Sequence, residues 1–243
     1  MGGRQTSVPT PLALSWSGGK DSAFALHELR DRHGIEPRAL VTTVTEEYQR
    51  VSMHGVRGRL LERQAAAAGV PLVRVGIPPH CTNDVYEARM AHALASATLR
   101  GVGAVAFGDL FLEDIRAYRE RQLAAAGKTA AFPLWGRDTT RLARDVIDAG
   151  FKAVVVCVDP ERLDPSFAGR RYEPGFLAEL PGEVDPCGEN GEFHTFVFDG
   201  PIFGRPVDCR IGEVTVRDGF AFCDLLPGPP AGTDGGPLPG PGP

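Results

Sequence analysis

Six consecutive residues near the start of the chain have the types needed to bind an anion: Ser17, Gly18, Gly19, Lys20, Asp21 and Ser22. An apolar run over residues 12–16 precedes them, and a helical pattern follows. In a strand–turn–helix unit, the backbone N–H groups of the turn and the positive end of the helix dipole point at the same place. The glycines let the backbone approach a ligand, and Lys20 adds a positive charge. These residues, the 17–22 turn, therefore predict a phosphate site.

Asp21 is the unusual member of the 17–22 turn. A carboxylate beside a phosphate repels it unless a cation lies between them, so Asp21 predicts a bound Mg²⁺ ion. The turn is not a Walker A loop, because the pattern Gly-x-x-x-x-Gly-Lys-Ser/Thr is absent. The plain alternative is an ordinary glycine-rich turn that carries no ligand.

A second dense group of polar residues, the 185–196 segment, lies towards the end of the chain. Gly188 and Gly191 allow a tight loop, so the side chains of Glu189, Glu192 and His194 can converge. If residues 195–198 form a strand, His194 shares a face with the phenylalanines at 196 and 198. The alternative is a solvated acidic turn that leads into a strand, in which Cys187 is a small packing residue.

The first part of the chain alternates between strand and helix patterns. Strands are predicted over 13–16, 38–44, 72–75 and 104–107, and helices over 22–32, 56–68, 82–100 and 115–126. This alternation predicts an α/β fold with a parallel sheet and helices on both faces. Ligands bind such sheets at the carboxyl ends of the strands, where the 17–22 turn, Thr42, Thr43, Gly108 and Asp109 all fall.

The pattern changes after residue 132. A helix over 141–148, a strand over 153–158 and β-like pieces near 207–216 and 220–225 predict a smaller α+β region packed over the first. Residues 227–243 consist almost wholly of glycine and proline, which predicts disorder. We therefore expect domains over 11–132 and 133–226, followed by a disordered tail.

Composition excludes several classes of protein. The net charge of −5, from 26 basic and 31 acidic side chains, argues against nucleic acid as the partner. No apolar run approaches the roughly 20 residues that span a bilayer, and residues 1–11 lack the apolar stretch of a leader peptide. The five widely spaced cysteines are typical of reduced thiols. We expect a cytoplasmic protein without membrane contact.

The 17–22 turn resembles the PP-loop, Ser-Gly-Gly-x-Asp-Ser, of the ATP pyrophosphatases. Nearly the whole chain resembles the diphthine–ammonia ligase family, through segments 17–22, 52–55, 107–114, 118–120, 132–135 and 188–196. The resemblance implies a HUP or PP-loop type of sheet, a carbon–nitrogen ligase, and an acceptor-binding role for the 133–226 region. ATP would activate a carboxylate acceptor as an acyl-adenylate, and ammonia would then displace AMP to leave an amide. The implied cofactors are ATP and Mg²⁺, and a homodimer is among the allowed states.

The resemblance also implies which residues act. Those assigned to ATP are Ser15, Ser17, Gly18, Gly19, Lys20, Asp21, Ser22, Thr42, Thr43, His54, Gly108 and Asp109, with Asp21 as the magnesium ligand. Those assigned to catalysis are Lys20, Asp21, Glu189, Glu192 and His194, the last three at the acceptor or ammonia site. Thr42 and Thr43 equally suit ordinary strand positions, His54 a surface or capping role, and Asp109 a helix N-cap.

One departure from the family pattern concerns the acceptor. Members that act on diphthine typically carry Tyr-Glu-Thr where this chain has Phe193, His194 and Thr195. The composition, rich in Ala, Gly, Pro and Arg and poor in Lys, indicates a bacterial source, in which diphthine is not expected. The acceptor is therefore open. The alternatives are a PP-loop enzyme of tRNA modification, or a non-catalytic module that binds adenine nucleotides.

Overall fold

The computed structural model describes residues 11–51, 54–96 and 98–229. Its first sheet contains β1 (Leu12–Ser15), β2 (Ala39–Thr45), β3 (Arg50–Val51), β4 (Leu72–Ile77), β5 (Ala104–Ala106) and β6 (Thr129–Ala131). The helices that alternate with these strands are α1 (Lys20–Asp31), α2 (Gly58–Ala68), α3 (Asn83–Leu94) and α4 (Glu113–Ala125). Strands and helices alternate along this part of the chain, as expected for a parallel sheet.

Strand β1 lies at the centre of the first sheet. It pairs in parallel with β2 on one side and with β5 on the other, while β4 and β6 extend the sheet outwards and the short β3 pairs antiparallel with β2. Successive side chains of β1 enter different cores: Leu14 packs with α1 and α2, and Ala13 packs with α3 and α4. Helices therefore cover both faces, and the predicted fold class is confirmed.

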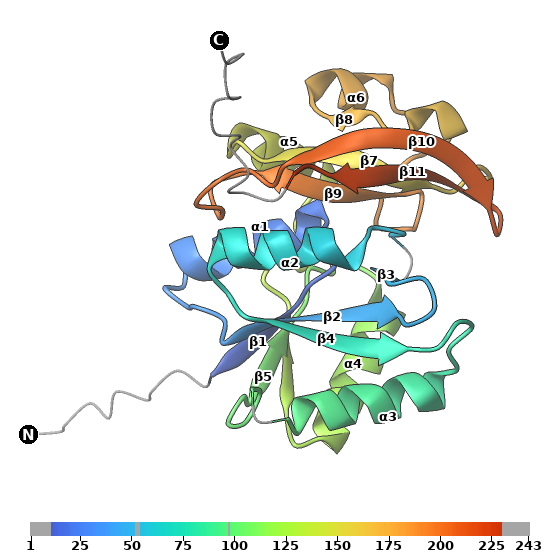
Figure 1. The fold of residues 1–243 in the computed structure, drawn as a ribbon. Helices are drawn as coiled ribbons and strands as arrows, with labels where there is room; N and C mark the ends of the chain where they lie inside the picture. Colours follow the sequence, from blue (N-terminus) through green and yellow to red (C-terminus); the bar gives the residue numbers. More distant parts are fainter. Residues whose placement is uncertain (1–10, 52–53, 97, 230–243) are drawn as a thin grey trace, which may run out of the picture.

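The later part of the chain forms a second, antiparallel sheet. Its strands are β7 (Lys152–Val158), β8 (Arg171–Tyr172), β9 (Phe193–Asp199), β10 (Cys209–Arg217) and β11 (Phe220–Pro227), in the order β10-β11-β7-β8 with β9 also paired to β7. Helices α5 (Thr139–Asp148) and α6 (Pro174–Glu179) and a 3₁₀ turn, η1 (Pro165–Phe167), accompany it. Figure 1 shows α1 and α2 between the two sheets. The domain limits at 132/133 and 226 stay a prediction.

One hydrophobic core joins the two sheets. It contains Leu26 of α1, Leu60 of α2, Val155 of β7 and Phe196 of β9, all fully buried. The apolar faces of α1 and α2 are thus covered on both sides. This shared core fixes the second sheet over the carboxyl end of β1, which positions the candidate site.

Some predicted elements differ from the structure. The helix expected over 82–100 ends at Leu94. Beyond it, the N–H groups of Ser96 and Leu99 form tight i→i−3 turn bonds to the carbonyls of Ala93 and Ser96. Leu99 is buried, so the apolar spacing imitated a longer helix. The sequence did not predict β3, β6, β8 and α6, which are all short.

The glycine- and proline-rich tail begins later than predicted. Strand β11 runs to Pro227, and the N–H of Gly228 donates to the carbonyl of Asp208. The predicted disorder of residues 230–243 lies outside the described residues. None of the helices that the structure describes is long and apolar enough to cross a membrane.

Candidate active site

A cavity of about 230 Å³ lies at the carboxyl ends of β1 and β5. The chain order reverses between these two strands, and such switch points are where open α/β sheets bind ligands. The lining residues are Ser15, Ser17, Gly19, Lys20, Asp21, Ser22, His54, Phe107, Gly108, Asp109, Arg119, Cys187, Gly188, Glu189, Phe193, His194 and Thr195. The structure therefore brings the 17–22 turn and the 185–196 segment together.

Local hydrogen bonds shape the 17–22 turn. The Oγ of Ser17 accepts from the N–H of Gly19 (3.2 Å), and the hydroxyl of Ser22 donates to the carbonyl of Gly19 (3.0 Å). Gly18 has φ +80°, and a Cβ there would lie 2.6 Å from Oε1 of Gln64. Both its backbone angle and its surroundings therefore require glycine.

Strand β9 binds the 17–22 turn directly. The N–H of Lys20 donates to Oγ1 of Thr195 (3.0 Å), and the N–H of Val197 donates to the carbonyl of Gly18 (2.9 Å). Thr195 thus provides a side-chain acceptor at the start of α1, where Gly19, the N-cap residue, has none. The wall of the predicted phosphate site is shared between two distant segments of the chain.

The buried side-chain amide of Gln64 bonds to both the 17–22 turn and β9. Gln64 is fully buried, and its Nε2 donates to the carbonyls of Gly18 (2.9 Å) and Val197 (2.6 Å). Its Oε1 accepts from the indole of Trp16 (3.0 Å). Neither Gln64 nor Thr195 was predicted from the sequence to be a site residue. The available signal for Gln64 was its position as a polar residue on the apolar face of an alanine-rich helix.

The buried Lys20 and the half-buried Asp21 form an ion pair in the wall of the cavity. The ammonium of Lys20 donates to both carboxylate oxygens of Asp21 (3.0 and 2.8 Å) and to the carbonyl of Cys187. Burial lowers the pKa of Lys20. The charge and hydrogen bond of Asp21, with smaller contributions from Cys187 and Asp185, more than offset this effect, so the net pKa of Lys20 is raised. Burial also raises the pKa of Asp21, against the pull of Lys20. Lys20 therefore stays charged and links α1 to the 185–196 segment.

The oxygen atoms that the cavity offers fit a magnesium ion that bound phosphates and water would hold in large part. Mg²⁺ is usually bound by one or two carboxylates together with substrate phosphates and water. Asp21 provides one carboxylate beside the hydroxyls of Ser17 and Ser22. In the part of the chain that the structure describes, no three His, Cys, Asp or Glu side chains form a metal-binding group.

Glu189 is the carboxylate best placed for proton transfer. Its Oε1 accepts from the N–H of Leu110 (2.7 Å), and its own N–H donates to the carboxylate of Asp185 (2.8 Å). Burial raises the pKa of Glu189 to about 7. A carboxyl group that titrates near neutral pH in a cavity has the properties of a general acid or base.

His194 lies against His54 in the same cavity. The ring centroids are 4.5 Å apart with an angle of 32° between the planes. Burial, together with the charge of Lys20, lowers the pKa of His194 to about 4. His194 is therefore neutral at physiological pH. Phe193, His194 and Thr195 of β9 all line the cavity. The pairing with β7 shifts at this point, with Val155 opposite Thr195 and Cys157 opposite His194, so the extra residue lies on β7.

Gly108 and Asp109 follow β5 at the cavity wall. A Cβ on Gly108 would lie 2.8 Å from the carbonyl carbon of Asp21, so this glycine allows the β5 loop to pack on α1. Asp109 accepts from Nε (2.5 Å) and Nη2 (3.1 Å) of Arg119. The alternative of an N-cap is wrong for Asp109, because Leu112 is the N-cap residue of α4.

Four of the predicted site residues do not line the cavity: Gly18, Thr42, Thr43 and Glu192. Thr42 is buried in β2, and Thr43 is half-buried beside it. Glu192 is buried, and its Oε1 accepts from the N–H of Asp185 (3.1 Å) and from the amide of Asn190 (3.0 Å). These contacts order the 185–196 segment. The roles predicted for the four residues in binding ATP or the acceptor stay predictions.

Two family models match almost all of the chain that forms this site. The model described as the diphthamide synthase N-terminal domain matches residues 11–127, and the model described as the diphthamide synthase C-terminal domain matches residues 138–225. The chain belongs to the diphthamide synthase family. In this family member, the 17–22 turn lies in the first match and the 185–196 segment in the second.

Relatives with curated names are called diphthine–ammonia ligase. The protein of Mus musculus is 26% identical over 244 residues, covering 88% of each chain, and that of Danio rerio is 25% identical over 235 residues. The human protein is 34% identical over 98 residues, which is 38% of this chain and 36% of its own. A solved structure described as a predicted subunit of tRNA methyltransferase from Methanocaldococcus jannaschii aligns over 77% of this chain and 96% of its own, at 15% identity and a TM-score of 0.40.

Proposed function

We propose that this family member is an ATP-dependent carbon–nitrogen ligase of the cytoplasm. An acceptor carboxylate attacks the α-phosphorus of ATP, which gives an acyl-adenylate and pyrophosphate. Ammonia then attacks the acyl carbon, and the products are an amide, AMP and a proton. The observation that carries the proposal is the junction of the 17–22 turn with β9, through the hydrogen bonds of Lys20 with Thr195 and of Val197 with Gly18.

The 17–22 turn would bind the phosphates of ATP. The start of α1, the hydroxyls of Ser17 and Ser22 and the ammonium of Lys20 supply donors and positive charge at one wall of the cavity. Such groups favour the charge that develops on the leaving pyrophosphate. Magnesium, when bound beside Asp21, would supply further positive charge there.

Glu189 would accept a proton from the attacking ammonia. Its carboxylate faces the cavity and titrates near neutral pH, so it can hold the proton that amide formation releases. His194, which packs against the ring of His54, would form an uncharged wall beside the acceptor, because His194 carries no charge at that pH.

The acceptor we propose is a carboxylate other than diphthine. Family members that act on diphthine typically have a glutamate where this chain has His194, and a neutral imidazole cannot provide the same charge. The names of the relatives support amide formation with ammonia, whereas the change from glutamate to His194 bears on the acceptor alone.

The test is the identity of the products made from ATP. Wild-type protein with Mg²⁺ and ammonium should form AMP and pyrophosphate in equal amounts when a panel of carboxylic acids is added. Asp21→Asn should lower this rate at least about tenfold, a loss of about 1.4 kcal/mol. Asp31→Asn, at an exposed position of the same helix, is the matched control and should leave the rate unchanged. Formation of ADP and phosphate would contradict the proposal.

A further inference from the structure

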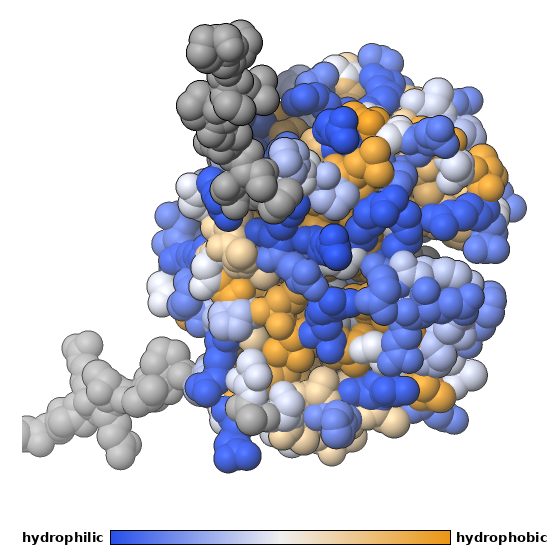
Figure 2. All heavy atoms as spheres, in the orientation of Figure 1, coloured by the Kyte–Doolittle hydropathy of each residue, from blue (hydrophilic) through white to orange (hydrophobic). Residues whose placement is uncertain are grey.

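Strand β10 is the outer edge of the second sheet. In residues 11–51, 54–96 and 98–229 it pairs with β11 alone. Three of its apolar side chains are exposed to solvent: Ile211 by 54%, Val214 by 47% and Val216 by 68%. Figure 2 shows hydrophobic side chains at the surface along the path of β10 in Figure 1. An exposed apolar edge strand is a template for pairing with another strand.

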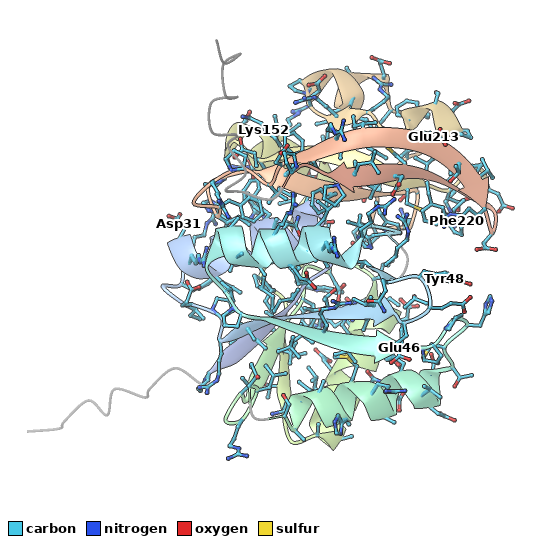
Figure 3. All side chains as sticks on the ribbon, viewed as in Figure 1. Asp31, Glu46, Tyr48, Lys152, Glu213 and Phe220 are labelled. Carbon is cyan, nitrogen blue, oxygen red and sulfur yellow. The ribbon has the colours of Figure 1, made fainter. Side chains whose placement is uncertain are left out.

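The register with β11 shows that the side chains of β10 divide by chemistry between two faces. Val214 lies opposite Cys223 and Val216 opposite Ala221, so the two valines share the face of the buried residues of β11. Thr215 and Arg217 lie opposite Phe222 and Phe220 on the other face. Figure 3 places Glu213 on β10 and Phe220 beyond the turn at its end.

Residues 213–217, Glu-Val-Thr-Val-Arg, are complementary to a second copy of themselves. If two such segments pair antiparallel with Thr215 opposite Thr215, then Val214 lies opposite Val216 and Glu213 opposite Arg217. Each apolar residue meets an apolar residue and each acid meets a base, on the faces given by the register with β11. Opposite charges and β-branched pairs at directly facing positions stabilise an antiparallel ladder.

The two ends of segment 213–217 allow only one register for its pairing with a second copy. The pairing of β10 with β11 shifts between Ile211 and Val214, so the regular edge begins near Glu213. It ends at the turn formed by Asp218, with φ +51°, and Gly219, with φ +82°. A shift of two residues along the partner would lose both Glu–Arg pairs.

We propose that β10 is a homodimer interface, in which residues 213–217 of two copies pair antiparallel about a two-fold axis at Thr215. The occupant is a second copy because the segment is self-complementary about one point, as an isologous two-fold contact requires. The pairing would join the two second sheets into one. It is independent of the proposed ligase activity.

The test is the molecular mass in solution, measured by light scattering and sedimentation over a dilution series. Wild-type protein should dimerise at high concentration. Arg217→Glu places two Glu–Glu pairs in the interface and Glu213→Arg places two Arg–Arg pairs, so each variant alone should be monomeric. Arg210→Glu, exposed on the same strand outside the segment, is the matched control and should dimerise like the wild type.

Mixing the two monomeric variants should restore the dimer, because every Glu then meets an Arg. The double variant that carries both Glu213→Arg and Arg217→Glu should also dimerise, with the charges exchanged. Circular dichroism of each variant checks its fold. A wild-type monomer at every concentration would overturn the proposal, and so would dimers that resist both single changes or a mixture that stays monomeric.

Discussion

The carboxyl group of Glu189 combines a half-buried position with a contact that fixes it. Its Oε1 is held by the N–H of Leu110, and burial raises its pKa to about 7. Asp21 is paired with Lys20 and Asp109 with Arg119, whereas the carboxylate of Glu189 accepts from a backbone N–H. At the scale of single residues, Glu189 is therefore the carboxylate that we propose for proton transfer.

The rate of amide formation should rise with pH through the titration of Glu189. The group must be deprotonated to accept a proton, so at a fixed concentration of neutral ammonia the rate should increase up to about pH 7 and then level off. Glu189→Gln keeps an oxygen for the N–H of Leu110 but cannot titrate, and should give a low rate that is flat across this range.

Stability provides a second readout for the same variant. Because the folded pKa of Glu189 lies above its ordinary value, the unfolded chain releases the proton first as pH rises. The free energy of unfolding of the wild type should therefore fall between the ordinary glutamate pKa and about 7, and Glu189→Gln should remove this part of the fall. An identical pH dependence in both proteins would contradict the assigned pKa.

For stability and ATP binding, the hydroxyl group of Thr195 should matter more than the size of this side chain. Thr195→Val keeps the shape but leaves the N–H of Lys20 without its acceptor, which we expect to cost about 1–3 kcal/mol of stability. Thr195→Ser keeps an acceptor and should be milder. Urea unfolding and ATP binding by calorimetry would measure both effects. Equal behaviour of the two variants would exclude the hydrogen bond as the cause.

At the scale of elements, features set by neighbouring residues could be predicted from the sequence, whereas features set by long-range contacts could not. The strand–turn–helix unit around Gly18 was predictable, since the turn, the helix start and the apolar run lie within one stretch of sequence. The end of α3 was not, because Leu99 is buried in a turn beyond the helix and keeps the apolar spacing. Spacing cannot reveal that Gln64 and Thr195 contact the 17–22 turn, because they lie 46 and 175 residues from their partners.

The close packing of the β5 loop on α1 should make Gly108 intolerant of a side chain. Gly108→Ala places a methyl group against the backbone of Asp21 and Ser22, and we expect it to destabilise the fold by about 1–3 kcal/mol. Gly175→Ala, where nothing lies within 4 Å of the added Cβ, is the matched control. Urea midpoints would compare them. A Gly108→Ala protein as stable as the control would contradict this packing.

At the scale of the whole molecule, the candidate site depends on two sheets that share one core. Helices α1 and α2 lie between the sheets, and residues from both sheets pack on them. The 17–22 turn belongs to the first sheet and the 185–196 segment to the second, so neither sheet alone encloses the cavity. The sequence predicted both segments, but their contact is a property of the assembled core.

The origin of the oxygen atoms in AMP tests the central claim most directly. In a reaction run in heavy-oxygen water with ATP, Mg²⁺, ammonium and an acceptor, the ligase account predicts AMP without label, because the new oxygen on phosphorus comes from the acceptor carboxylate. Mass spectrometry of AMP would measure this. Simple hydrolysis of ATP would place the heavy oxygen in AMP. Labelled AMP, formed at a rate that ammonium and acceptor do not change, would contradict the account.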